Sequence, residues 1–250
     1  MKIISGSSDF RDSGNIQLIT EKSKHSGSTG GVSIQTGQAY LDQSGDVILK
    51  TGEGESVTAG KIALQIGITS GNVGGKIEVI AGTSLKYKGG NLIMKSGHGD
   101  THGGAVTIDG GDGSMASGGS ITISSGVGTA TSSGSVAVST SNAGTAGVSG
   151  DLSLSTGTAS VGDSGALDIG SGSSASGSGG SIAISVGSGT DIGGAFSVTA
   201  GDSSGAAGGD ASIVSGSSST SSGGSLTLAS GDGNTSGGAV TIDGGDGSTA

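Results

Sequence analysis

Three histidines, His25, His98 and His102, are the only imidazoles in this sequence. His98, Asp100 and His102 alternate along the chain, so on an extended segment they would share one face and could hold a divalent metal ion. The pattern occurs once, in a glycine-rich stretch, and no fourth ligand lies near it in sequence. We therefore expect no metal site here.

Two acidic runs of sequence DGGDG, at residues 109–113 and 243–247, resemble the glycine-rich turns that present Asp oxygens to Ca²⁺ in nonapeptide repeats. Those repeats recur every nine residues, whereas the pattern here recurs about every fifteen and most copies lack both Asp. We expect no bound cofactor, although diffuse association of Ca²⁺ with an acidic surface is compatible with this composition.

Catalysis by a nucleophile requires a base within hydrogen-bond reach, and no His or Lys follows His102. Matches to glycine-rich phosphate loops carry no weight with 58 glycines in 250 residues, and no Gly-Lys-Ser or Gly-Lys-Thr completes such a loop. We expect that the chain is not an enzyme. Its many Ser and Thr hydroxyls could accept O-glycans.

The net charge of -10 is unevenly distributed. Residues 1–100 hold ten Lys and Arg against nine Asp and Glu, and residues 101–250 hold eleven Asp and neither Lys nor Arg. Binding to nucleic acid or to an anionic membrane surface needs clustered basic residues. No stretch approaches the roughly 20 apolar residues of a membrane span. Nucleic acid is therefore not an expected partner, and membrane insertion is not expected.

The dominant feature of the sequence is a repeat: Gly, any residue, aliphatic, any residue, aliphatic, two small or polar residues, Gly, as in GSITISSG at 119–126. It occurs seventeen times at steps of 14 to 16 residues. The residue two before the first aliphatic is Gly in all sixteen copies that have one, and the residue five after it is Gly in fifteen of seventeen, with Glu21 and Ser141 as exceptions. Such a register is not typical of a disordered low-complexity chain.

Alternation within each unit predicts one short strand, and stacking successive units at about 4.8 Å would align equivalent aliphatic residues. The sequence therefore predicts an all-β fold, a single-chain β-solenoid (β-helix or β-roll) of about 17 coils with a repeat of about 15 residues, continuous over 1–250. Residues 1–100 would form charged, aliphatic-rich coils, and 101–250 acidic Gly/Ser-rich coils. The predicted structural core ladder consists of Ile16, Leu18, Val32, Ile34, Val47, Leu49, Ile62, Leu64, Ile77, Val79, Leu92, Met94, Val106, Ile108, Ile121, Ile123, Val136, Val138, Leu152, Leu154, Leu167, Ile169, Ile182, Ile184, Phe196, Val198, Leu226, Leu228, Val240 and Ile242.

A second aliphatic set stands on the opposite side of the early units. An exposed aliphatic row implies a covered surface, so this set is a candidate lateral contact with another chain. The alternative is a second internal face. The candidate residues are Ile4, Ile19, Ile48, Ile80 and Ile93.

The units GGSITISSG, GDLSLSTG and GGSLTLASG resemble the Gly/Ser-rich tandem repeats of fibrous surface proteins and of viral or phage fibres. The resemblance implies the structural shaft of a filament or fibre, assembled from copies of the chain as a homo-oligomer. It also implies an extracellular, cell-surface or virion-surface location, with any binding chemistry on a distal domain.

A weaker resemblance is to insect-type ice-binding solenoids, which present regular rows of Thr. The residue between the two aliphatics is Thr at 107, 122, 227 and 241, and other residues interrupt the row elsewhere. An adhesin-like or ice-binding surface is therefore the alternative function. The segment GGAVTIDGGDGS, at 103–114, recurs unchanged at 237–248, so we expect a window of a longer array or a subunit whose ends stack.

Overall fold

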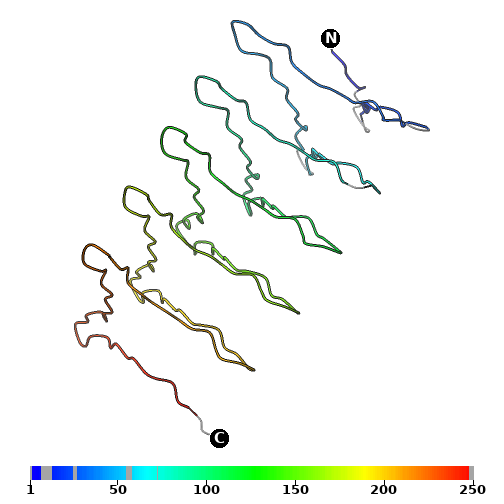
Figure 1. Cartoon of the computed structure of the whole chain (residues 1–250). Helices are drawn as coiled ribbons and strands as arrows, with labels where there is room; N and C mark the ends of the chain where they lie inside the picture. The colour runs from blue at the N-terminus through cyan, green and yellow to red at the C-terminus, as the bar shows by residue number, and fades with distance from the viewer. Residues whose placement is uncertain (1, 7–12, 25–26, 55–57, 72, 248–250) are drawn as a thin grey trace. The chain divides into compact units, whose positions relative to one another are not determined.

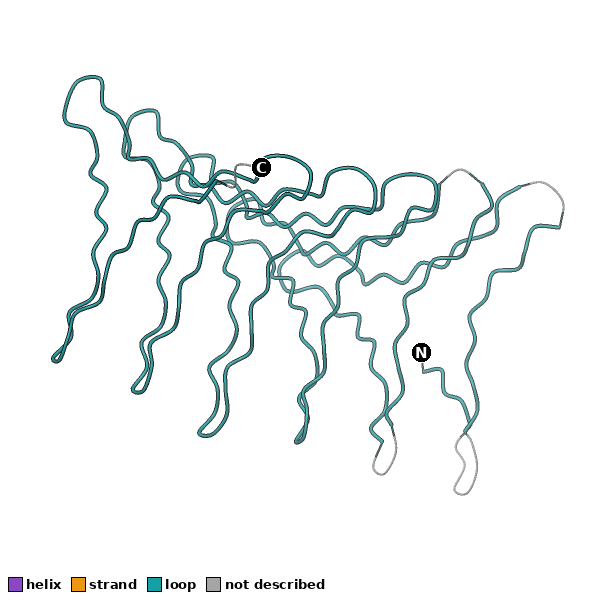
Figure 2. Ribbon diagram, turned by 90° about the horizontal axis from the view of Figure 1, so that it is seen from below, coloured by secondary structure: helices purple, strands orange, loops and turns teal. Residues whose placement is uncertain are grey.

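The structure is a computed structural model and describes residues 2–6, 13–24, 27–54, 58–71 and 73–247. None of these residues belongs to a helix or a β-strand, so the fold has no such elements to delimit (Figure 1). Figure 2 shows all of the described residues drawn as loop. The predicted all-β, single-chain β-solenoid is therefore wrong: the described chain is irregular.

The missing feature is the hydrogen-bond ladder between coils. Only ten backbone–backbone hydrogen bonds join described residues, whereas a folded protein of this length carries about 170 backbone–backbone hydrogen bonds. Each of the ten runs from the N–H of the glycine that opens one repeat unit to the C=O of the glycine that closes the unit before it, as from Gly90 to Gly82 at 2.8 Å. We call this pair a neck, the residues between its two glycines a loop, and the residues that lie between one neck and the next, without the neck glycines, an extended segment.

The described chain divides into two compact units, each of which contains many repeat units: Met1–Ile123 and Ser124–Ala250. In each, extended segments alternate with chain reversals (Figure 1). Alternating aliphatic and β-branched residues favour an extended backbone locally, but no backbone hydrogen bond pairs one described segment with another. The necks of the first compact unit join Gly6–Gly14, Gly82–Gly90, Gly97–Gly104 and Gly111–Gly119. The necks of the second compact unit join Gly126–Gly134, Gly172–Gly180, Gly187–Gly194, Gly201–Gly209, Gly216–Gly224 and Gly231–Gly238.

The residue just before the closing glycine, which we call the neck residue, packs against the opening glycine in every neck except that of Gly111 and Gly119, where it is itself a glycine. A Cβ added to Gly90 would lie 3.7 Å from the Cβ of Ala81, and one added to Gly180 would lie 3.1 Å from that of Ser171. Ser171 also donates a hydrogen bond from its Oγ to the Gly180 carbonyl, at 2.8 Å. The opening glycine therefore serves a close approach between backbone and side chain, and small neck residues ease it.

The same kind of side-chain hydrogen bond occurs in four loops whose closing and opening glycines are eight residues apart. In each, the second residue after the closing glycine is Ser, and its Oγ accepts a bond from the backbone N–H three residues on, as from Gly177 to Ser174 at 2.8 Å. Such Ser–backbone bonds are typical of tight turns. In another loop Gly162 adopts a φ of +90°, which a side chain would strain. In the other three of the four loops with a Ser bond, the backbone N–H groups of Tyr87, Ala206 and Ser221 donate to the Oγ atoms of Ser84, Ser203 and Ser218, respectively.

The three shortest loops contain a different kind of contact, between a glycine and the backbone of a later residue. Their closing and opening glycines are seven residues apart instead of the usual eight, and each begins Gly-x-Gly. At Gly99, Gly189 and Gly233, an added Cβ would collide with the backbone carbonyl oxygen of the residue three positions later. Two eight-step loops that also begin Gly-x-Gly place a backbone carbonyl oxygen in the same way against Gly113 and Gly128. A loop with this start therefore needs a glycine at this place, because a backbone atom occupies the volume of the missing side chain.

The chain has no hydrophobic core: no described residue is buried, whether apolar or polar. Its accessible surface is 24958 Å² for a mass of 23.0 kDa. A folded monomer of that mass exposes about 9,600 Å², and its unfolded chain about 33,000 Å². A single chain in this conformation therefore removes only a small part of its surface from water.

Candidate functional surface: the exposed aliphatic face

The residues singled out for chemistry do not come together. His98, Asp100 and His102 are exposed, and among the described residues no group of three His, Cys, Asp or Glu side chains could hold a metal ion. His25 lies outside the described residues. The described part of the chain has no detectable pocket and no helix long and apolar enough to cross a membrane.

The regular surface of the chain is a row of aliphatic side chains. Three positions of each unit lie on one side of an extended segment: the first aliphatic, the second aliphatic and the neck residue, because side chains alternate. We call this side the aliphatic face. Its first position is between 52% exposed, at Ile121, and 64% exposed, at Phe196, in every predicted ladder residue that occupies it. The predicted ladder therefore lies on the surface of the single chain and forms no buried core within it.

The second position of the aliphatic face is more exposed than the first. It ranges from 62% at Ile108 to 84% at Ile242 among the predicted ladder residues. The first position lies closer to the neck, which accounts for its partial cover. Hydrocarbon surface of this extent is costly in water, at about 25 cal/mol for each Å².

Charge is excluded from this face. The sequence has seventeen units with three face positions each, fifty-one in all, and none of its 30 charged residues falls on one. The opposite side of the same segments carries Lys, Glu and Asp, as at Lys76, Glu78 and Asp168. An apolar side without a single charge is typical of a buried surface, yet it is open in the single chain.

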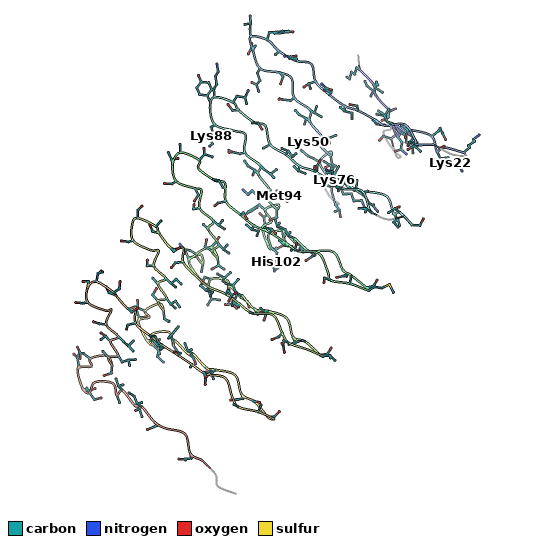
Figure 3. All side chains as sticks on the ribbon, viewed as in Figure 1. Lys22, Lys50, Lys76, Lys88, Met94 and His102 are labelled. Atoms are coloured by element: carbon teal, nitrogen blue, oxygen red, sulfur yellow. The ribbon has the colours of Figure 1, made fainter. Side chains whose placement is uncertain are left out.

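The opposite side is exposed and carries both charged and aliphatic side chains. Lys76 donates a hydrogen bond from Nζ to Oε1 of Glu78 at 2.7 Å, and both side chains are exposed. The two residues are two apart, so this contact agrees with alternation along the segment. Figure 3 labels Lys76 together with Lys22, Lys50, Lys88, Met94 and His102. The candidate lateral-contact residues also lie here, exposed between 68% at Ile4 and 82% at Ile80; the others are Ile19, Ile48 and Ile93.

Two neck residues escaped the sequence reasoning. Ile66 and Val186, at 44% and 45%, are the least exposed large hydrophobic side chains of the described chain. A Cβ added to Gly75 would lie 2.6 Å from Cγ2 of Ile66, and one added to Gly194 would lie 2.5 Å from Cγ1 of Val186. The signal was present as a β-branched residue followed eight or nine positions later by an opening glycine.

Comparison with protein-family models, with curated proteins and with solved structures returned no match.

Proposed function

We propose that this chain is a structural protein: a repeat-built part of a filament or fibre, formed by association of copies of itself. The observation that carries the proposal is the aliphatic face, which recurs about every fifteen residues, bears no charge and stays exposed in a single chain. Surface of this kind is expected to be covered by another molecule. A periodic surface is suited to periodic assembly.

The proposed location is outside the cell, on a cell surface or on the surface of a virion. The loops support this, because they consist largely of Gly, Ser, Thr, Ala and Asp, and such small polar residues suit a solvated outer surface. Ser and Thr in the loops are also acceptors for O-glycans. In this role the residues with consequences are structural: the aliphatic face and the neck glycines.

Negative-stain electron microscopy of the purified chain tests the proposal, with the same protein in guanidinium chloride as the unassembled control. We expect elongated rods or filaments that disappear in denaturant. Immunogold labelling of the native material should place the label on projecting fibres. Compact globules of uniform size, or label confined to the cell interior, would contradict the proposal.

A further inference from the structure

The extended segments have a constant length, whereas the loops do not. From the opening to the closing position of a unit the step is seven residues in all sixteen units that have both, from 14–21 to 238–245. The loops between them take steps of seven, eight or nine residues. A constant segment with variable loops indicates that each segment fits against something of fixed length, while the loops project freely.

Nothing within a single chain supplies that constraint. The described segments form no backbone hydrogen bond with one another, and their aliphatic faces are open. The N–H and C=O groups of each segment are therefore available, as at the exposed edge of a sheet. Their fixed length must be matched by a partner outside the chain.

The size of the exposed surface says how extensive that partner must be. The chain exposes about 15,000 Å² more than a folded monomer of its mass. A standard protein–protein interface covers only about 800 Å² of each partner. Contact at one patch, or along one side of the loops, would leave most of the excess uncovered. The partner must reach the segments along the whole chain.

A copy of this chain meets these requirements. It offers segments with the same seven-residue step at the same spacing of about fifteen residues, so that pairing at one unit permits pairing at the next. Its aliphatic face is equally free of charge, so two faces can meet without burying an unpaired carboxylate or ammonium group. An unrelated protein would need to match sixteen successive units.

We propose that copies of this chain interleave along their whole length. In this assembly each extended segment pairs through its backbone with segments of other copies, and the aliphatic faces of several chains form one shared core. This inference rests on the proposed function, because it names the partner that completes the filament. The loops, with most of the aspartates, then lie at the outside of the assembly.

A matched pair of variants tests the inference in the full chain. Val136 stands on the aliphatic face and is 56% exposed in the single chain, and Val161 stands in a loop and is 94% exposed. Val136→Asp and Val161→Asp make the same chemical change, so a single chain would tolerate both. Interleaving predicts that Val136→Asp weakens association at least ~10-fold, because the carboxylate enters the shared core, and that Val161→Asp leaves it unchanged. Light scattering coupled to size exclusion measures the mass against 23.0 kDa for one chain.

Hydrogen exchange of the unmodified protein gives a second measurement, which does not depend on a variant that folds. Interleaving predicts slow exchange for amides of the extended segments in the assembled fraction, fast exchange in the loops, and loss of the segment protection on dissociation. Fibre diffraction should show a spacing of about 4.8 Å. A single-chain mass at micromolar concentration, with segment amides exchanging as fast as loop amides, would overturn the inference, as would equal effects of the two variants.

The two proposals fail in different ways. Filaments of many copies whose segment amides exchange as fast as loop amides, and which Val136→Asp and Val161→Asp affect equally, would leave the structural function standing and overturn the interleaving. Small, compact oligomers with protected segments would support the interleaving and contradict the filament.

Discussion

Gly194 lies so close to Val186 that it has no room for a side chain: an added Cβ would stand 2.5 Å from Cγ1 of Val186. The Gly194 N–H donates to the carbonyl of Gly187 at 3.1 Å, so the same residue closes the neck. The adjacent Gly193 has no atom within 4 Å of such a Cβ. Two neighbouring glycines thus have different reasons to be there, and they make a natural test.

Gly194→Ala should destabilise the protein by about 1–3 kcal/mol, because a methyl group placed against a stiff β-branched side chain forces the neck apart. Gly193→Ala should change stability by less than about 0.5 kcal/mol. The midpoint of guanidinium chloride unfolding, at fixed protein concentration, measures both.

The double variant Val186→Ala, Gly194→Ala provides the control for mechanism. At the neck of Gly209 the neck residue is Ala200, and an added Cβ would lie 3.8 Å from its Cβ, which is ordinary contact. Shortening Val186 should therefore recover most of the stability lost in Gly194→Ala, with a coupling energy of about 1 kcal/mol or more. Additive losses in the two single variants would show that the contact is not the cause.

Gly189→Ala should open the short loop that follows Gly187. The added methyl group would meet the backbone carbonyl oxygen of Ile192, which cannot rotate away as a side chain can. We expect a loss of about 1–3 kcal/mol and faster exchange of the Gly194 amide, which closes this loop. Gly187→Ala is the matched control, because an added Cβ there meets nothing within 4 Å. Equal exchange rates for the Gly194 amide in the two variants would contradict the prediction.

Ser174→Ala should release the Gly177 amide. The Ser174 Oγ accepts a bond from this N–H at 2.8 Å, in a fully exposed loop. Water can replace an exposed partner, so we expect a loss of at most about 1 kcal/mol. Exchange of the Gly177 amide should become several-fold faster. Ser173→Ala is the control, because Ser173 makes no hydrogen bond in the structure, and it should leave the exchange rate of the Gly177 amide unchanged. If Ser174→Ala also leaves that rate unchanged, the Ser174 hydrogen bond does not protect the amide.

The local part of the fold could be predicted from the sequence. The glycines at 82 and 90 occupy the two fixed glycine positions of the repeat, and in the structure they bond to each other. The alternation at Val136 and Val138 predicts extended backbone, because it depends on neighbouring residues alone. The neck of Val186 was missed, since that residue is not one of the two aliphatics that define the repeat.

The long-range part of the fold was predicted wrongly, because it depends on which extended segments pair with one another. Val136 and Leu152 occupy equivalent positions, and stacking them within one chain was an inference from their equal spacing. Identical spacing serves pairing within a chain and pairing between chains equally well, so the repeat does not decide between them. The structure leaves both residues 56% exposed, without backbone bonds between their segments.

The absence of Lys and Arg after Lys95 predicts a salt-dependent assembly. Residues 101–250 carry eleven Asp and no Lys or Arg, and association of copies brings these charges closer. Raising the ionic strength from low values to about 0.15 M shortens the Debye length to about 8 Å and screens this repulsion, so the thermal midpoint should rise. NaCl and CaCl₂ at matched ionic strength should have similar effects if Ca²⁺ acts only diffusely. Protein treated with a chelator provides the reference. A large rise of the thermal midpoint with micromolar Ca²⁺ alone would contradict diffuse binding and reveal an ordered site. Asp109 and Asp112 would then be the first residues to replace by Asn.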